Sequence, residues 1–185
     1  MIRKLTYEEI TSQRPNLQEL QEKNRFPVSV IIENVRSLYN VGSIFRTSDG
    51  AGIEKLYICG YTACPPRKEI EKTALGSTES VPWEWRARAC DAIAELKSRG
   101  YAIVALEHTD ISVSLTESLY QFPVCLVIGN EVEGVSQETL ERCDMAVEIP
   151  MHGIKQSLNV AVAYGIAVYS IVERFLRNNK SKNSF

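Results

Sequence analysis

The sequence predicts an α/β fold, in which helices flank a mainly parallel β-sheet. Five short apolar runs rich in β-branched residues have the composition of buried strands. Helical patterns separate most of these runs, giving the order β-α-β-α-β-β-α-β-α, which is typical of a parallel sheet. The chain has 185 residues, which is most simply one domain with a substantial core.

The first half of the chain supplies two predicted strands around one helix. Residues 1–27 form an N-terminal arm, helical in part and broken at Pro15, and the first strand covers residues 28–32. A helix follows over residues 40–52, with Asn40 as a plausible N-cap and Gly50 or Gly52 as the stop signal. The second strand is 55–59, and a long loop over 61–82 contains a short helix near 69–75.

The second half continues the alternation. An amphipathic helix over 86–99 ends at Gly100, and strands follow at 101–106 and 124–128. Ser136 caps a short helix over 137–142, and a fifth strand covers 145–149. We expect a domain over 28–177 and a polar tail over 178–185.

The final helix, predicted over 157–177, is apolar on nearly every face. Such a helix is buried on all sides, so we expect it to pack against the sheet and against a second subunit. The alternative is a central helix of a monomer.

Composition narrows the class of protein. Hydrophobic residues make up 44% and charged residues 24%, and the net charge of −2 argues against nucleic-acid binding by bulk electrostatics. A local basic patch stays possible. Five scattered cysteines without a C-x-x-C pair indicate neither disulfides nor a metal site. We expect a cytoplasmic protein with no signal peptide and no membrane span.

The segments that follow the predicted strands carry most of the informative polar residues. They are 34–46, 106–108, 129–134 and 151–159. Because ligands bind beyond the carboxyl ends of parallel strands, these segments predict one shared site.

Two of these segments each have a second interpretation. Residues Gly129 to Gly134 place two glycines around two carboxylates, but match neither the dinucleotide fingerprint nor the phosphate loop, and an ordinary turn with solvated acids explains them equally well. Arg46 suits a phosphate clamp or the activation of a hydroxyl, although an ion pair with Asp49 is the more common arrangement in a helix.

The remaining candidates are weaker. His108 and His152 have no partner at a spacing that suggests a catalytic triad, and Ser157 lacks the G-x-S-x-G context of a nucleophile. Trp83 and Trp85 either pack or offer a stacking face, with packing the more common use.

Three stretches, taken together, resemble the SpoU (TrmH-like) branch of the SPOUT RNA methyltransferases. They are residues 34–47, residues 126–136, and residues 149–151 with 156–163. They occur in the family's order across nearly the whole chain.

The resemblance implies a fold, a reaction and an assembly. The fold would carry a deep trefoil knot near the C-terminus, formed around 129–134 and 149–159. The cofactor would be S-adenosylmethionine, the reaction methylation of a ribose 2′-hydroxyl in RNA, and the active unit a homodimer through the C-terminal helix. Transfer RNA is the first expected target and ribosomal RNA the second.

The resemblance also assigns roles to residues. Arg46 would assist deprotonation of the hydroxyl, and the residues that shape the site around it would be Asn34, Glu131, Ser157 and Asn159. Backbone groups near five residues would hold the cofactor: Leu106, Gly129, Ile149, Met151 and Leu158. In an acidic chain, RNA contact would depend on local cations, namely Arg3, Lys4, Arg36, Arg67, Lys68, Lys72 and Lys155.

Two other functions compete with this one. A non-catalytic RNA-binding or assembly module could keep the knotted fold without turnover. A nucleotide-dependent oxidoreductase on a Rossmann-like sheet would need a glycine fingerprint that the sequence lacks.

Overall fold

A single parallel sheet organises the chain. The computed structural model describes residues 1–182, and their strands form one seven-stranded sheet in the order β3-β2-β1-β6-β4-β7-β5. Every pair of neighbouring strands is parallel. The strands are β1 (Phe26–Glu33), β2 (Ile53–Cys59), β3 (Trp83–Arg86), β4 (Ala102–Leu106), β5 (Val113–Ser114), β6 (Val124–Ile128) and β7 (Met145–Glu148). The predicted α/β class with a mainly parallel sheet is confirmed.

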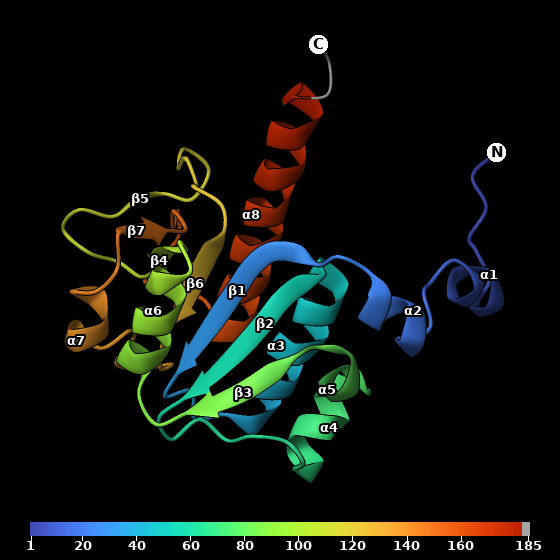
Figure 1. Ribbon diagram of the computed structural model, residues 1–185, viewed down its shortest axis with the longest axis horizontal. Helices are drawn as coiled ribbons and strands as arrows, with labels where there is room; N and C mark the ends of the chain where they lie inside the picture. Colours follow the sequence, from blue (N-terminus) through green and yellow to red (C-terminus); the bar gives the residue numbers. More distant parts are fainter. Residues whose placement is uncertain (183–185) are drawn as a thin grey trace.

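Helices cover both faces of the sheet (Figure 1). The helices of residues 1–182 are α1 (Tyr7–Ser12) and α2 (Leu17–Glu22), both in the N-terminal arm, and α3 (Leu38–Ala51), α4 (Lys68–Ala74), α5 (Ser77–Ser80), α6 (Ala89–Ser98), α7 (Gln137–Leu140) and α8 (Val160–Lys182). Alternate residues of a strand point to opposite faces, so Val30 and Ile32 pack on the side of α3 and α8, whereas Ile31 packs on the side of α6. The apolar strands thus contribute side chains to two hydrophobic cores, one on each face of the sheet.

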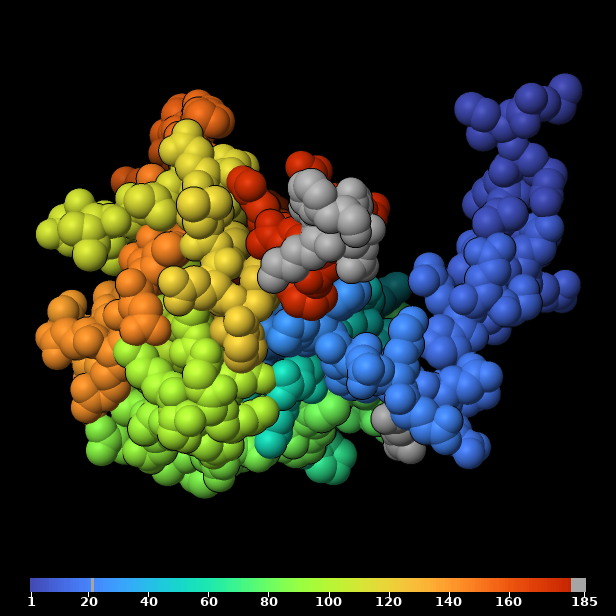
Figure 2. Space-filling view, turned by 45° about the horizontal axis from the view of Figure 1, so that its top comes forward, coloured from blue at the N-terminus to red at the C-terminus, as the bar shows by residue number. Residues whose placement is uncertain are grey.

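The N-terminal arm projects from the body of the molecule (Figures 1 and 2). Its two helices flank Pro15, and each begins with a capping box: Thr6 with Glu9, and Asn16 with Glu19. These caps supply local order where there is little burial, because no residue of α1 is buried.

Several predicted boundaries were wrong. Ser37, not Asn40, is the N-cap of α3, and its hydroxyl accepts a hydrogen bond from the Asn40 N–H at 3.3 Å. The helix ends at Gly52, which adopts a left-handed conformation, and Gly50 lies inside it. The strands β3 and β5 were not predicted.

The last helix is shifted from the predicted range. It begins at Val160 rather than 157 and continues to Lys182, so residues 178–182 of the predicted tail are helical. Residues 183–185 of that tail lie outside the described residues. One face of α8 is buried through Tyr164 and Val168, while Ile166 and Tyr169 on the other face are 44% and 53% exposed. The alternative of a helix covered entirely within one chain is therefore wrong.

Candidate active site

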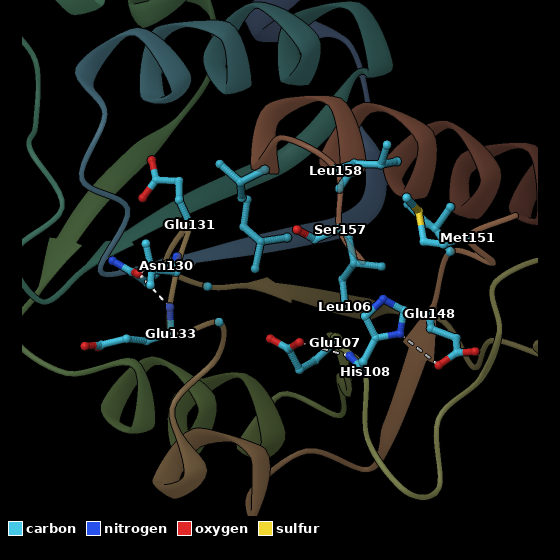
Figure 3. A pocket seen from close by; sticks show the side chains of 17 residues that line it. Leu106, Glu107, His108, Asn130, Glu131, Glu133, Glu148, Met151, Ser157 and Leu158 are labelled. Atoms are coloured by element: carbon cyan, nitrogen blue, oxygen red, sulfur yellow. Dashed lines mark hydrogen bonds and ion pairs between the residues drawn. The ribbon is translucent and has the colours of Figure 1, made fainter. Parts of the chain in front are cut away.

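A cavity of about 210 Å³ opens at the carboxyl ends of β4, β6 and β7, beside the start of α8 (Figure 3). The residues expected to hold a cofactor all line it: Leu106, Gly129, Ile149, Met151 and Leu158. Of the residues expected to shape the chemistry, Glu131 and Ser157 also line it. The convergence at one sheet edge therefore occurs where the order of the strands predicted it.

The loop after β6 is a closed turn that requires its two glycines. Asn130 and Gly134 exchange two backbone hydrogen bonds, of 2.9 and 3.0 Å. A Cβ on Gly129 would lie 2.2 Å from the carbonyl carbon of Gly134. Gly134 has a φ of +69°, and a Cβ there would lie 2.1 Å from Glu107 Oε2. A side chain at Gly129 would therefore collide with the backbone of this loop, and one at Gly134 would be strained by the positive φ.

Glu131 is not the solvated acid of the alternative interpretation. Its carboxylate accepts hydrogen bonds from the N–H groups of Arg36 and Ser37, both at 3.0 Å, and from the Asn40 amide at 2.9 Å. Burial alone would raise the pKa of Glu131, but these donors outweigh it and hold the pKa below its ordinary value. The carboxylate is therefore charged, and it ties the start of α3 to the loop after β6.

Asn40 joins this group to the start of α8. Its amide nitrogen donates to Glu131, and its amide oxygen accepts from Asn159 Nδ2 at 3.1 Å. Asn159 in turn caps α8, since its side-chain oxygen accepts from the N–H groups of Ala161 and Val162. The sequence pattern had assigned Asn40 only a capping role, so it is a site residue that sequence reasoning missed.

Asn34 uses its side chain elsewhere. It adopts a left-handed conformation with a φ of 57°, and its side-chain oxygen accepts a 3.2 Å hydrogen bond from the Tyr61 N–H. Its backbone carbonyl accepts from the Asn130 amide at 2.9 Å. Asn34 thus supports the site from outside the cavity, and its side chain does not line it.

Arg46 lies on the exposed side of α3 and does not line the cavity. The ion pair with Asp49 that its spacing favoured is absent, and Asp49 accepts a hydrogen bond from the Ser80 hydroxyl. Among residues 1–182, the Arg46 guanidinium makes neither an ion pair nor a hydrogen bond. The Arg46 guanidinium is therefore a cation at the surface of α3 that a ligand can contact.

Three further residues line the cavity, namely Glu107, His108 and Glu148. No sequence pattern had grouped them. The His108 ring lies 3.1 Å from Glu148 Oε2, and Figure 3 shows this pair beside Leu106. Hydrogen bonds from the Ser112 hydroxyl and from His108 lower the pKa of Glu148. Glu107 accepts from the Val135 N–H at 2.9 Å and so holds the end of the glycine loop.

Only the order of the strands could have revealed the pair of His108 and Glu148. The two residues are 40 positions apart, but β4 and β7 are neighbours, with Leu106 opposite Val147. His152, in contrast, is exposed in the loop before α8.

The two tryptophans lie in different environments. Trp83 packs edge-on against Phe45, with ring centroids 6.2 Å apart, whereas Trp85 is 52% exposed. Two of the five cysteines, Cys59 and Cys125, are fully buried.

Within residues 1–182, no helix combines the length and apolar character of a membrane span. The same residues contain no cluster of three or more side chains suited to a metal ion.

Comparison with known proteins agrees with this geometry. The model of the SpoU rRNA Methylase family matches residues 27–169. The tRNA (guanosine(18)-2′-O)-methyltransferase of Aquifex aeolicus is 39% identical over 154 residues, which are 83% of this chain and 72% of the relative.

Solved structures share the fold. The crystal structure of the A. aeolicus TrmH/SpoU tRNA modifying enzyme superposes with a TM-score of 0.78 at 35% identity, covering 88% of this chain and 84% of that one. The AdoMet-bound rRNA methyltransferase from Sinorhizobium meliloti gives a TM-score of 0.76 at 30% identity, covering 85% and 60%. The chain therefore belongs to the SpoU rRNA methylase family.

Proposed function

We propose that this protein transfers a methyl group from S-adenosylmethionine to a ribose 2′-hydroxyl of RNA, with transfer RNA as the first expected substrate and ribosomal RNA as the second. The observation that carries the proposal is one juxtaposition: the cavity beyond β4, β6 and β7 adjoins the hydrogen-bonded group of Glu131, Asn40 and Asn159. The cavity suits a cofactor, and the hydrogen-bonded group fixes the positions of the polar side chains beside it.

The residues present fit S-adenosylmethionine. Leu106, Ile149 and Leu158 give the cavity an apolar wall suited to a purine ring. Backbone groups of the glycine loop and the carboxylates of Glu131 and Glu148 lie on its polar side, where they favour a cation. When bound, the cofactor supplies a methyl group on a positively charged sulfur.

The chain must position and activate the hydroxyl. A ribose hydroxyl is a weak nucleophile, so its oxygen has to be aligned with the methyl carbon, and the negative charge that develops on it has to be stabilised. Arg46 supplies that positive charge, and it acts as a proton relay or charge-stabilising group rather than as a free base, because arginine side chains are not deprotonated in proteins. Ser157 and Asn159 orient the groups between the cavity and α3.

In a dimer, Arg46 of one subunit would lie at the cavity of the other subunit. Within one chain Arg46 does not line the cavity, and the apolar side chains of Val162, Ile166 and Tyr169 leave a face of α8 uncovered. We propose that a second copy covers this face and that RNA is held across both subunits. We also propose that the segments 129–134 and 149–159 form a deep trefoil knot, and that the protein acts in the cytoplasm on cellular RNA.

Methyl transfer to unmodified RNA tests the function. The protein is incubated with S-adenosylmethionine labelled in the methyl group and with transfer RNA transcribed in vitro. We expect label in the RNA and, after alkaline hydrolysis, in a dinucleotide, because a 2′-O-methyl group blocks cleavage of the adjoining phosphodiester. Label in mononucleotides would place the methyl group on a base instead.

The competing functions give other outcomes. A non-catalytic module would bind the transcripts without labelling them. An oxidoreductase would bind NADH in preference to S-adenosylmethionine in a calorimetric titration. Ribosomal RNA transcripts, run in parallel, decide between the two expected substrates.

A further inference from the structure

A second cleft lies beside the proposed active site, with a volume of about 670 Å³. The side chains that distinguish it are those of Arg36, Tyr61, Arg67 and Trp85, and the backbone at Gly60 forms part of its wall. No carboxylate lines it. Two cations and two aromatic rings without an acid form an unusual surface in a chain whose net charge is −2.

The two rings are exposed but held in place. Trp85 is 52% exposed, and its indole N–H donates to the Gly60 carbonyl at 3.2 Å. Tyr61 is 59% exposed, and its hydroxyl accepts from the Asn130 amide at 2.9 Å. Because the polar group of each ring is already hydrogen-bonded, the ring is held in place. A planar ligand can therefore stack on its apolar face at little cost in conformational entropy.

The turn that carries Tyr61 is itself fixed. Gly60 has a φ of +65°, and a Cβ on it would lie 2.0 Å from the Asn34 side-chain oxygen. That oxygen accepts from the Tyr61 N–H. The left-handed Asn34 thus directs its side chain to the turn that carries Tyr61 rather than into the cavity.

The two arginines are available to an anion. Neither the Arg36 nor the Arg67 guanidinium pairs with a carboxylate anywhere in residues 1–182, and both residues are exposed. Most other arginines of the body are paired, such as Arg86 with Glu84 and Glu95. Arginine binds phosphate groups through its planar fork of donors and also stacks on bases.

Hydrogen bonds join residues of this cleft to residues of the active-site cavity. The backbone N–H of Arg36 donates to Glu131, and the Tyr61 hydroxyl bonds to Asn130, so residues of the glycine loop hold both elements. A ligand that spans the cavity and this cleft is therefore a chain of linked units with planar groups and phosphates.

We propose that this cleft binds the nucleotide next to the one that is methylated: its base stacks on Trp85 and Tyr61, and its phosphodiester is bound by Arg36 and Arg67. This inference rests on the proposed function for its ligand, a single-stranded stretch of RNA. An acidic peptide would use the two arginines but would leave the two ring faces without a planar partner.

Fluorescence of Trp85 tests the proposal directly. The chain has two tryptophans, so a Trp83→Phe variant reports on Trp85 alone. Hexauridylate is titrated into this variant in the presence of saturating S-adenosylhomocysteine. We expect saturable quenching, and binding about tenfold weaker when Arg67→Ala or Arg36→Ala is added. The control Arg142→Ala changes an exposed arginine of the region after α7 and should bind as the parent does.

Methyl transfer provides the second measurement, on variants that keep Trp83. Trp85→Ala should raise KM for the RNA about tenfold while leaving the affinity for S-adenosylmethionine unchanged, since stacking of a base on an aromatic ring stabilises bound single-stranded RNA. Trp85→Phe should restore most of the loss because a phenyl ring still stacks.

The outcomes separate the two proposals. Labelled RNA with an unchanged KM for Trp85→Ala, or quenching by polyglutamate as strong as that by hexauridylate, would overturn the subsite while leaving the proposed function in place. Quenching that depends on Arg36 and Arg67 without any methyl transfer would support the subsite and overturn the enzymatic function.

Discussion

The amide nitrogen of Asn40 lies 2.9 Å from Glu131 Oε1, although the two residues are 91 positions apart in the chain. This contact joins the first turn of α3 to the glycine loop after β6. The other end of the same amide accepts from Asn159, at the start of α8. A single side chain thus sets the spacing of the three segments that surround the proposed chemistry.

Replacing Asn40 should therefore reduce both methyl transfer and stability. Asn40→Ala removes one hydrogen bond to a charged group and one to a neutral group, at a cost of about 2–4 kcal/mol in total. We expect kcat to fall at least tenfold, because Glu131 and Asn159 lose their common partner. Ser43→Ala is the matched control, since the Ser43 hydroxyl bonds only to the Tyr39 carbonyl of its own helix. Equal kcat values for the two variants would remove Asn40 from the site.

The charge on Glu131 should appear in the acid stability of the protein. Its pKa is lowered in the folded state, so the stabilisation is complete at pH values above the unfolded pKa, about 4.3. It is lost as the pH falls through the lower pKa of the folded state. Glu131→Gln should therefore be less stable than the parent at pH 7, and the difference should shrink toward pH 3. Urea unfolding at a series of pH values measures this.

Glu133→Gln is the control for this titration, because the Glu133 side chain makes no hydrogen bond within residues 1–182. Its stability should follow that of the parent at every pH. A constant difference between Glu131→Gln and the parent from pH 7 to pH 3 would contradict the assignment.

Arg46→Ala should abolish methyl transfer and leave cofactor binding intact. The guanidinium has no partner among the described residues, so its loss removes positive charge without breaking a contact of the folded chain. Calorimetry should give the parent's affinity for S-adenosylmethionine, while transfer of labelled methyl falls by at least a hundredfold. Arg142→Ala should keep normal turnover. Near-normal turnover of Arg46→Ala would exclude this residue from the mechanism.

Gly129→Ala should open the glycine loop. A Cβ at this position meets the backbone of Gly134 and Val135 at 2.2 Å, and backbone cannot move aside as a flexible side chain does. We expect a loss of about 1–3 kcal/mol in the free energy of unfolding and a weaker affinity for S-adenosylmethionine. Gly153→Ala is the control, because a Cβ there has no atom within 4 Å. Equal cofactor affinity in both variants would show that the loop does not hold the cofactor.

The strands that the sequence predicted best are those buried on both faces. The runs in β1 and β6 contain only apolar or small residues over most of their length, and burial on both faces requires this of a parallel strand. The edge strand β3 was missed because Trp83-Glu84-Trp85-Arg86 is short and half exposed. Its pairing with β2 depends on a tertiary contact that no local pattern encodes.

The residues of the candidate site also differ in whether the sequence could predict them. Residues that follow strands, such as Gly129, could be placed because strand order brings them to one edge, whereas Ile149 was assigned only by the family resemblance. Asn40 could not, since an asparagine before a helical run has the pattern of an N-cap, and its partners lie 91 and 119 positions away. The left-handed conformation of Asn34 was equally invisible, because no local pattern encodes the bond between its side chain and the Tyr61 N–H in the turn after β2.

The exposed face of α8 provides the last prediction. Val162, Ile166 and Tyr169 are 53%, 44% and 53% exposed, and they lie on the side of α8 opposite the buried Tyr164 and Val168. Clustered apolar exposure on a helix indicates a protein interface. Ile166→Glu would place a charge in that interface and should shift the protein from dimer to monomer in sedimentation velocity, with loss of methyl transfer. Leu75→Glu changes a side chain that is 66% exposed at the end of α4, which packs on α3, so it should stay dimeric. A parent protein that sediments as a monomer at micromolar concentration would contradict the dimer, and an active monomeric Ile166→Glu variant would show that one chain holds the complete site.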